Sequence, residues 1–259
     1  VLLGLGNTVE VVIIAALLAP AGVALRIASL RTALRFIVVV LVGAVGSGVA
    51  LGAVASVFLE RPFLEATAQL TASHAAATLV MLPLVLVPLA DGRPVRALEV
   101  SIQSVALVAL VAIVFWPGND WPIAFVPLVA FLWAALRFSL IITAVQLVVT
   151  AFAVIILTTL GGGPFAVVDG DTRAPVVLIQ IFLLVYAVTS LLIVGARTDW
   201  FLLIRRLQAQ EEALRVGIVT ADAGIVILDR PEGRLRTVTI NPRARRALGS
   251  ELPPYGVPE

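Results

Sequence analysis

Repeated apolar runs of about 20 residues are the feature of this chain that most constrains its fold. Of its 259 residues, 61% are hydrophobic and 13% are charged, whereas an ordinary soluble domain is roughly half apolar and a quarter charged. A helix of about 20 residues crosses the roughly 30 Å hydrocarbon core of a bilayer. A transmembrane β-barrel would instead show alternating segments of roughly 10 residues. The sequence therefore predicts an all-α polytopic membrane bundle, with the lipid bilayer as its first partner.

Residues 1–196 divide into about seven predicted membrane spans. Short connections rich in Gly, Pro, Asn and Asp separate several of them, including those at 91–94, 117–120 and 161–164. The predicted spans are 2–18, 34–58, 66–89, 100–116, 122–136, 139–160 and 174–196. We assign 1–196 to a single transmembrane bundle.

Arginine placement predicts the orientation of the bundle. All 18 basic residues are arginine, and cytoplasmic loops are enriched in basic residues. One set of span ends carries Arg26, Arg31, Arg35, Arg93, Arg96, Arg137, Arg197, Arg205 and Arg206. The opposite set carries only Arg61 and Arg173. The C-terminus is therefore predicted to be cytoplasmic. Because the arginines are spread among loops, we expect no nucleic-acid partner.

A charged amphipathic segment at 197–216 follows the last span and is predicted to form a linker helix. Its apolar residues follow a 3-4 spacing, which is typical of a coiled-coil seam. They are Trp200, Leu203, Leu207 and Leu214, with Gln210 as a polar interruption. We interpret the segment as a signalling helix that forms a homodimer. A single helix lying on its own bundle is the alternative.

Residues 217–259 change to α/β character. Two segments at 224–229 and 235–240 have strand composition, and a ProGluGly turn at 231–233 separates them. Asn241 is a suitable N-cap and Pro242 suits a first helical position. A short helix is therefore predicted at 243–248, with Gly249 as its stop.

This order of elements resembles the start of a PAS domain. The matched region, 216–249, has two strands followed by an Asn-led helix that ends near Leu-Gly. It covers the first third to half of such a domain, so 217–259 is expected to be the N-terminal part of one. Most walls of any ligand pocket would lie outside this chain, and we assign it no cofactor.

Five stretches of the membrane part together form a recognisable pattern. They are GlyAsnThrValGlu at 6–10 with AlaAlaLeuLeu at 15–18, LeuArgThrAlaLeuArgPhe at 30–36, His74 with MetLeuProLeu at 81–84, LeuTrpAlaAlaLeuArgPhe at 132–138, and GlyGlyGlyProPhe at 161–165. In their order and spacing they resemble the type-one membrane-associated sensor (MASE) family of bacterial signalling proteins, which implies that 1–196 is a transmembrane sensor bundle. By this resemblance the chain is expected to lack the family's first helices, and His74 stands where an acidic residue is expected in many members.

The resemblance implies a sensory input module in the bacterial inner membrane, responding to an unknown stimulus. Such proteins often end in GGDEF or EAL domains, which make or degrade cyclic di-GMP, and others end in histidine kinases. None of these output motifs is present here, so we expect no catalytic activity from this chain. A transporter with a regulatory cytoplasmic tail is the alternative.

Glu10 and His74 are the sharpest candidates for a functional site. An ionisable residue at membrane depth is costly and usually faces the bundle interior or a cavity. Both lie at similar depth in spans that run in the same direction, and Asn7 shares the face of Glu10. We interpret these three residues as ligand- or proton-sensing, with a structural polar pair as the alternative. The chain has no Cys, and no metal site is expected.

Other polar or small residues within the spans are predicted to serve packing. Gln103, Gln146 and Gln180 are expected to make interhelical hydrogen bonds. Ala44, Gly48, Gly52 and Ser56 repeat at every fourth position of one span. Small residues on one face let helix backbones approach closely. We interpret this stripe as packing inside the bundle, with a dimer interface as the alternative.

Overall fold

The computed structural model describes residues 2–18, 29–86, 96–166, 174–229 and 236–248. These residues belong to two compact units, Val1–Asp199 and Trp200–Glu259. The boundary lies three residues beyond the predicted end of the bundle at 196. The turns predicted at 91–94 and 231–233, Arg26, Arg93, Arg173 and the helix stop at Gly249 lie outside the described residues.

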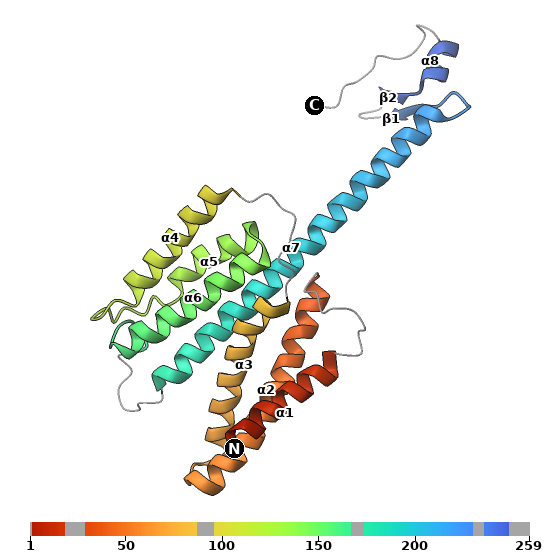
Figure 1. Ribbon diagram of the computed structural model, residues 1–259. Coiled ribbons are helices and arrows are strands. Elements are labelled where there is room, and N and C mark those ends of the chain that lie inside the picture. The colour runs from red at the N-terminus through yellow and green to blue at the C-terminus, as the bar shows by residue number, and fades with distance from the viewer. Residues whose placement is uncertain (1, 19–28, 87–95, 167–173, 230–235, 249–259) are drawn as a thin grey trace. The chain divides into compact units, whose positions relative to one another are not determined.

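The first unit is built from helices whose ranges follow the predicted spans (Figure 1). They are α1 (Leu2–Leu18), α2 (Leu30–Leu59), α3 (Phe63–Leu86), α4 (Ala97–Val114), α5 (Val126–Arg137), α6 (Leu140–Thr159) and the first part of α7 (Ala174–Thr220). Five of them, α2, α3, α4, α6 and α7, are long and apolar enough to cross a bilayer. An all-helical membrane bundle is therefore the architecture of this unit.

The two remaining apolar helices, α1 and α5, are shorter. Helix α5 has 12 residues, which at 1.5 Å per residue is well below the roughly 30 Å of hydrocarbon that a span must cross. It begins at Val126, four residues after the predicted start, because residues 121–125 are not helical. A total of seven membrane crossings therefore stays a prediction.

Local capping sets the start of α2 earlier than hydrophobicity alone predicted. The Ser29 hydroxyl accepts a hydrogen bond from the Thr32 amide, and the Thr32 hydroxyl accepts one from the Ser29 amide. This reciprocal pair forms a capping box, which satisfies two amides at a helix start. The helix consequently begins at Leu30 and not at Leu34.

The start of α2 is also held by α7. The Leu30 amide donates a 2.8 Å hydrogen bond to Asp199 Oδ2, and a carboxylate is favourable at a helix N-terminus. Gly195 allows this approach, because a Cβ there would lie only 3.0 Å from Leu30 Cα. The part of α7 nearest the unit boundary is thus fixed to α2.

Glycines on α2 bring α1 and α3 against its backbone. A Cβ at Gly43 would lie 2.7 Å from the Ile14 side chain of α1. On the α3 side, a Cβ at Gly48 would lie 2.9 Å from the Thr71 amide nitrogen, and one at Gly52 would lie 3.0 Å from Thr67 Cα. The predicted small-residue stripe therefore serves packing inside the bundle at Gly48 and Gly52, where α3 occupies the space that a dimer partner would need.

Two of the three predicted interhelical amides are confirmed. Gln103 of α4 donates a 2.8 Å hydrogen bond to the Ala130 carbonyl of α5. Gln146 of α6 donates to the Gln103 side-chain carbonyl at 2.6 Å and to the Ser104 hydroxyl at 2.8 Å. These bonds join α4, α5 and α6. Gln180 differs, since its side-chain oxygen is buried and accepts no hydrogen bond from the described residues.

The second unit contains the end of α7, strands β1 (Val226–Asp229) and β2 (Arg236–Ile240), and helix α8 (Pro242–Leu248). The strands pair antiparallel, with an irregularity between Ile227 and Leu228. The predicted order of two strands and an Asn-led helix is therefore present. The linker helix is not a separate element, because α7 continues unbroken from Ala174 to Thr220.

We predict that Gly48→Val destabilises the bundle by about 1–3 kcal/mol, the usual cost of overpacking a tight contact. The added side chain would meet the backbone of α3 at Thr67 and Thr71. Ala53→Val on the exposed face of α2 is the matched control and should leave stability nearly unchanged. Thermal unfolding in detergent, followed with oligomer mass, measures both variants. A folded Gly48→Val protein that only loses a dimer would contradict the packing role.

Candidate functional site

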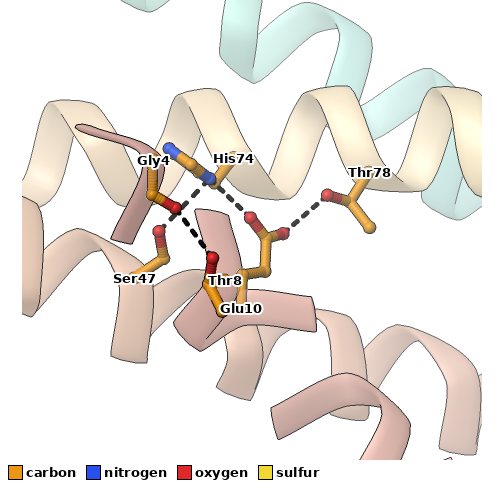
Figure 2. Close-up of polar contacts among 6 residues, drawn as sticks. All are labelled: Gly4, Thr8, Glu10, Ser47, His74 and Thr78. Carbon is orange, nitrogen blue, oxygen red and sulfur yellow. Dashed lines mark hydrogen bonds and ion pairs between the residues drawn. The ribbon is translucent and has the colours of Figure 1, made fainter. Parts of the chain in front are cut away.

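Four polar residues from three helices form a cluster inside the apolar bundle (Figure 2). Glu10 comes from α1, Ser47 from α2, and His74 and Thr78 from α3. Glu10 Oε2 lies 2.5 Å from His74 Nδ1, and the Thr78 hydroxyl donates to Glu10 Oε1 at 2.6 Å. The Ser47 hydroxyl lies 3.3 Å from the same His74 nitrogen. The structure thus brings Glu10 and His74 into direct contact.

Helical spacing explains why these side chains converge. His74 and Thr78 are four residues apart, so they project from one face of α3. Glu10 and Ile14 are likewise four apart on α1, and both are buried while Val11 and Val12 are exposed. Glu10 is therefore on the inward face of α1, directed toward α3.

The cluster satisfies both oxygens of a buried carboxylate. The Glu10 residue is only 6% exposed, and an unpaired buried carboxylate would be very costly. One oxygen is bonded to the imidazole and the other to a hydroxyl. With a proton on Nδ1, the His74 ring donates a hydrogen bond to the Glu10 carboxylate. This hydrogen bond favours the tautomer that carries its proton on Nδ1.

The second imidazole nitrogen is directed away from Glu10 in Figure 2. No hydrogen bond from the part of the chain that the structure describes reaches this Nε2 atom. The His74 side chain is also more exposed than that of Glu10, at 18% against 8%. The ring therefore has one nitrogen committed to the carboxylate and one available to a proton donor, a water molecule or a polar ligand.

Asn7 does not join the cluster. Its side chain is exposed, and among the described residues no hydrogen bond links it to Glu10, Ser47, His74 or Thr78. A separation of three residues rotates a side chain by about 300°, which leaves it about 60° from its neighbour on the helix. That offset is enough to put Glu10 inside and Asn7 at the surface of α1.

Sequence reasoning missed Ser47 and Thr78 as members of the site. Thr78 carried a usable signal, since it stands four residues after His74 on the same face. Ser47 carried none, because its contact with His74 depends on how closely α2 and α3 pack. Thr and Ser are also common in membrane helices without any site.

The four apolar residues of the predicted linker seam are all more than half exposed in this chain. They are Trp200, Leu203, Leu207 and Leu214. Exposed large apolar residues at 3-4 spacing are compatible with the predicted coiled coil. Dimerisation remains a prediction.

The Asn241 side chain makes four hydrogen bonds within the second unit. Its Oδ1 accepts hydrogen bonds from the Ile225 and Ala244 amides, at 3.0 and 2.9 Å. Its Nδ2 donates to the Ile218 and Ala223 carbonyls, at 3.1 and 2.8 Å. The predicted N-cap is confirmed by the bond to Ala244. The same side chain also joins the last turn of α7 to the start of β1.

Comparison of the chain with protein-family models, curated proteins and solved structures finds no match. The similarities to a MASE domain and to the start of a PAS domain accordingly remain predictions from the sequence.

We predict that Glu10 and His74 are energetically coupled. Glu10→Gln and His74→Gln should each destabilise the bundle, and the double variant should cost less than their sum by about 1–2 kcal/mol. The reason is that each single change leaves a buried polar partner unsatisfied. Reversible unfolding in bicelles measures the cycle. The control is Thr8→Val, on the exposed side of α1; its change in unfolding free energy should add to that of His74→Gln. If the changes for Glu10→Gln and His74→Gln are themselves additive, the contact between the two residues is absent.

We also predict that Asn241→Ala destabilises the second unit by about 2–4 kcal/mol, since four hydrogen bonds are each worth about 0.5–1.5 kcal/mol net. Asn241→Asp should cost less, because it keeps the acceptor for Ile225 and Ala244. Amide hydrogen exchange at these two residues is the measurement, with the exposed Arg246→Ala of α8 as control. Unchanged protection in Asn241→Ala would refute the anchoring role.

Proposed function

We propose that this chain is the membrane sensory input module of a bacterial signal-transduction protein, multi-pass in the inner membrane with its C-terminus in the cytoplasm. In the intact protein it controls an output domain, for which the sequence resemblance favours a GGDEF or EAL domain acting on cyclic di-GMP. A histidine kinase is the second output class. The stimulus acts on the bundle, and the chain itself performs no catalysis.

The observation that carries the proposal is helix α7. It is 47 residues long and unbroken, and it belongs to the apolar bundle at its start and to the α/β unit at its end. A continuous helix passes rotation or translation along its axis, because its backbone hydrogen bonds resist local unwinding. Asn241 then ties the last turn of α7 to β1 and α8.

A route of packed contacts leads from the polar cluster to α7. Ser47 contacts His74 from α2. The first residue of α2, Leu30, donates to Asp199 of α7 and packs against Gly195. A change in the protonation or occupancy of the cluster would therefore act on the middle of a helix whose first residue is fixed to α7. Coupling along this route is part of the proposal and needs a functional test.

The alternative function, a transporter with a regulatory tail, has one observation in its favour. Buried ionisable residues in membrane helices also mark proton and ion pathways, and the Glu10–His74 pair fits that description. Proton or substrate flux in liposomes that Glu10→Gln abolishes would support the transporter, whereas a tight bundle without flux supports the sensor.

Insertions in the linker test the sensor proposal in the intact protein. One alanine inserted between Gln208 and Ala209 rotates the downstream helix by about 100°, while seven inserted residues restore its phase to within about 20°. The single insertion should change output strongly, measured as cellular cyclic di-GMP or as kinase autophosphorylation. The seven-residue insertion should largely restore it. If neither insertion alters output, α7 is a passive tether and the proposal is wrong.

A further inference from the structure

We infer that the end of α7 binds the same segment of a second copy of this chain, as a parallel two-stranded coiled coil in which Arg206 of each helix pairs with Glu211 of the other. An apolar seam supplies the contact, and the two ion pairs set its register. The inference rests on the proposed function in one respect: both copies lie in one membrane with the same orientation, so their α7 helices run parallel. The output domain and the Glu10–His74 cluster have no part in it.

The apolar residues of this segment fit one heptad register. Trp200, Leu207 and Leu214 are seven residues apart and take the a positions, while Leu203 and Gln210 take the d positions. The four apolar side chains are all more than half exposed. Because α7 continues unbroken from the bundle, this short seam needs no separate helix nucleation, which is the cost that makes short isolated helices marginal. The seam is therefore a preformed apolar face.

Two residues of opposite charge flank this seam. In the register that the leucines set, Arg206 is a g residue and Glu211 is the e residue of the next heptad. In a parallel pair of helices, a g residue lies beside the e residue five positions further along the other helix, and ion pairs at these positions decide partner and orientation. Two-fold symmetry repeats the contact, so one dimer has two such pairs. The face is thus complementary in charge to a second copy of itself.

Arg206 and Glu211 have no charge partner in their own chain. Both are exposed, and within the described part of the chain no ion pair or hydrogen bond includes either of them. The neighbouring Arg205 differs, since its guanidinium lies 4.4 Å from the centre of the Phe201 ring. Arg205 and Phe201 take the f and b positions, on the outer side of the helix. Arg206 and Glu211 are therefore available to a second helix.

Gln210 makes the register specific. At a d position its amide lies opposite the same amide of the second helix, and each offers the other a donor and an acceptor. Sliding one helix by a heptad would place Gln210 against Leu203 or Gly217 and leave a buried amide unpaired, which is unfavourable. The same shift would separate Arg206 from Glu211. A single polar residue in an apolar seam is an established determinant of register.

Cysteine cross-linking of the full chain in liposomes tests the seam, because the native chain has no cysteine. Leu203→Cys and Leu214→Cys place one thiol at a d or an a position, and each variant should form a disulfide-linked dimer on mild oxidation. Gln208→Cys and Glu212→Cys, at the outer b and f positions, are the matched controls. They should cross-link about tenfold more slowly, because a disulfide requires closely spaced Cα atoms. Equal rates at all four positions, or no dimer from the two seam variants, would overturn the inference.

Charge reversal tests the ion pairs, with Leu214→Cys as the reporter in every variant. Arg206→Glu and Glu211→Arg should each lower the cross-linking rate about fivefold at low salt, since either change replaces both attractive pairs with repulsive ones. The two reversals combined should restore the native rate. Glu212→Arg on the outer face is the control and should leave the rate unchanged.

A double reversal that fails to restore the rate, or a Glu212→Arg variant that lowers it as much, would show that Arg206 and Glu211 do not pair. These rates are measured without any signal output. The dimer can therefore fail while the linker insertions still support the sensor proposal, and the insertions can fail while the dimer stands.

Discussion

The close approach of α1 and α3 to the backbone of α2 is the constraint on which the described membrane unit most depends. Gly43 accommodates Ile14 on one side, and Gly48 and Gly52 accommodate Thr71 and Thr67 on the other. In a bilayer, lipid tails are as apolar as the side chains, so helices associate through close packing and polar contacts rather than through hydrophobic burial. The glycines of α2 permit that packing, and it brings Glu10 of α1 within reach of His74 of α3.

The polar cluster and Gln180 illustrate two consequences of placing polar atoms in an apolar medium. Both carboxylate oxygens of Glu10 are bonded, which makes a buried ionisable group tolerable. The Gln180 side-chain oxygen has no hydrogen-bond partner among the described residues, and an unsatisfied buried acceptor costs about 1–3 kcal/mol.

Much of the fold was predictable from the sequence alone, because the spacing of apolar residues and the position of turn residues determine helices and turns within single segments. Helix ranges, the strand order and the Asn241 cap were readable from single segments. The contact between Glu10 and His74 was predictable from the similar depth of the two residues in their spans. Two features were not: the outward placement of Asn7 and the contribution of Ser47, which depend on packing between elements distant in sequence. The unbroken passage of α7 through the predicted boundary at 196 was not predicted, although no Gly or Pro stands between Gly195 and Gly217.

The contact between Glu10 and His74 is the centre of this account, and the chain offers a direct way to measure it. His74 is its one histidine, so ¹⁵N-histidine labelling reports a single imidazole. Solid-state NMR in lipid bilayers, with ¹³C-labelled glutamate carboxyls, measures the distance from that ring to the nearest carboxylate. The account predicts a strong dipolar coupling between a glutamate ¹³C carboxyl and His74 ¹⁵Nδ1, as a 2.5 Å oxygen–nitrogen contact requires. This coupling should be lost in Glu10→Gln. A His74 ring with no carboxylate nearby in the native chain would contradict it.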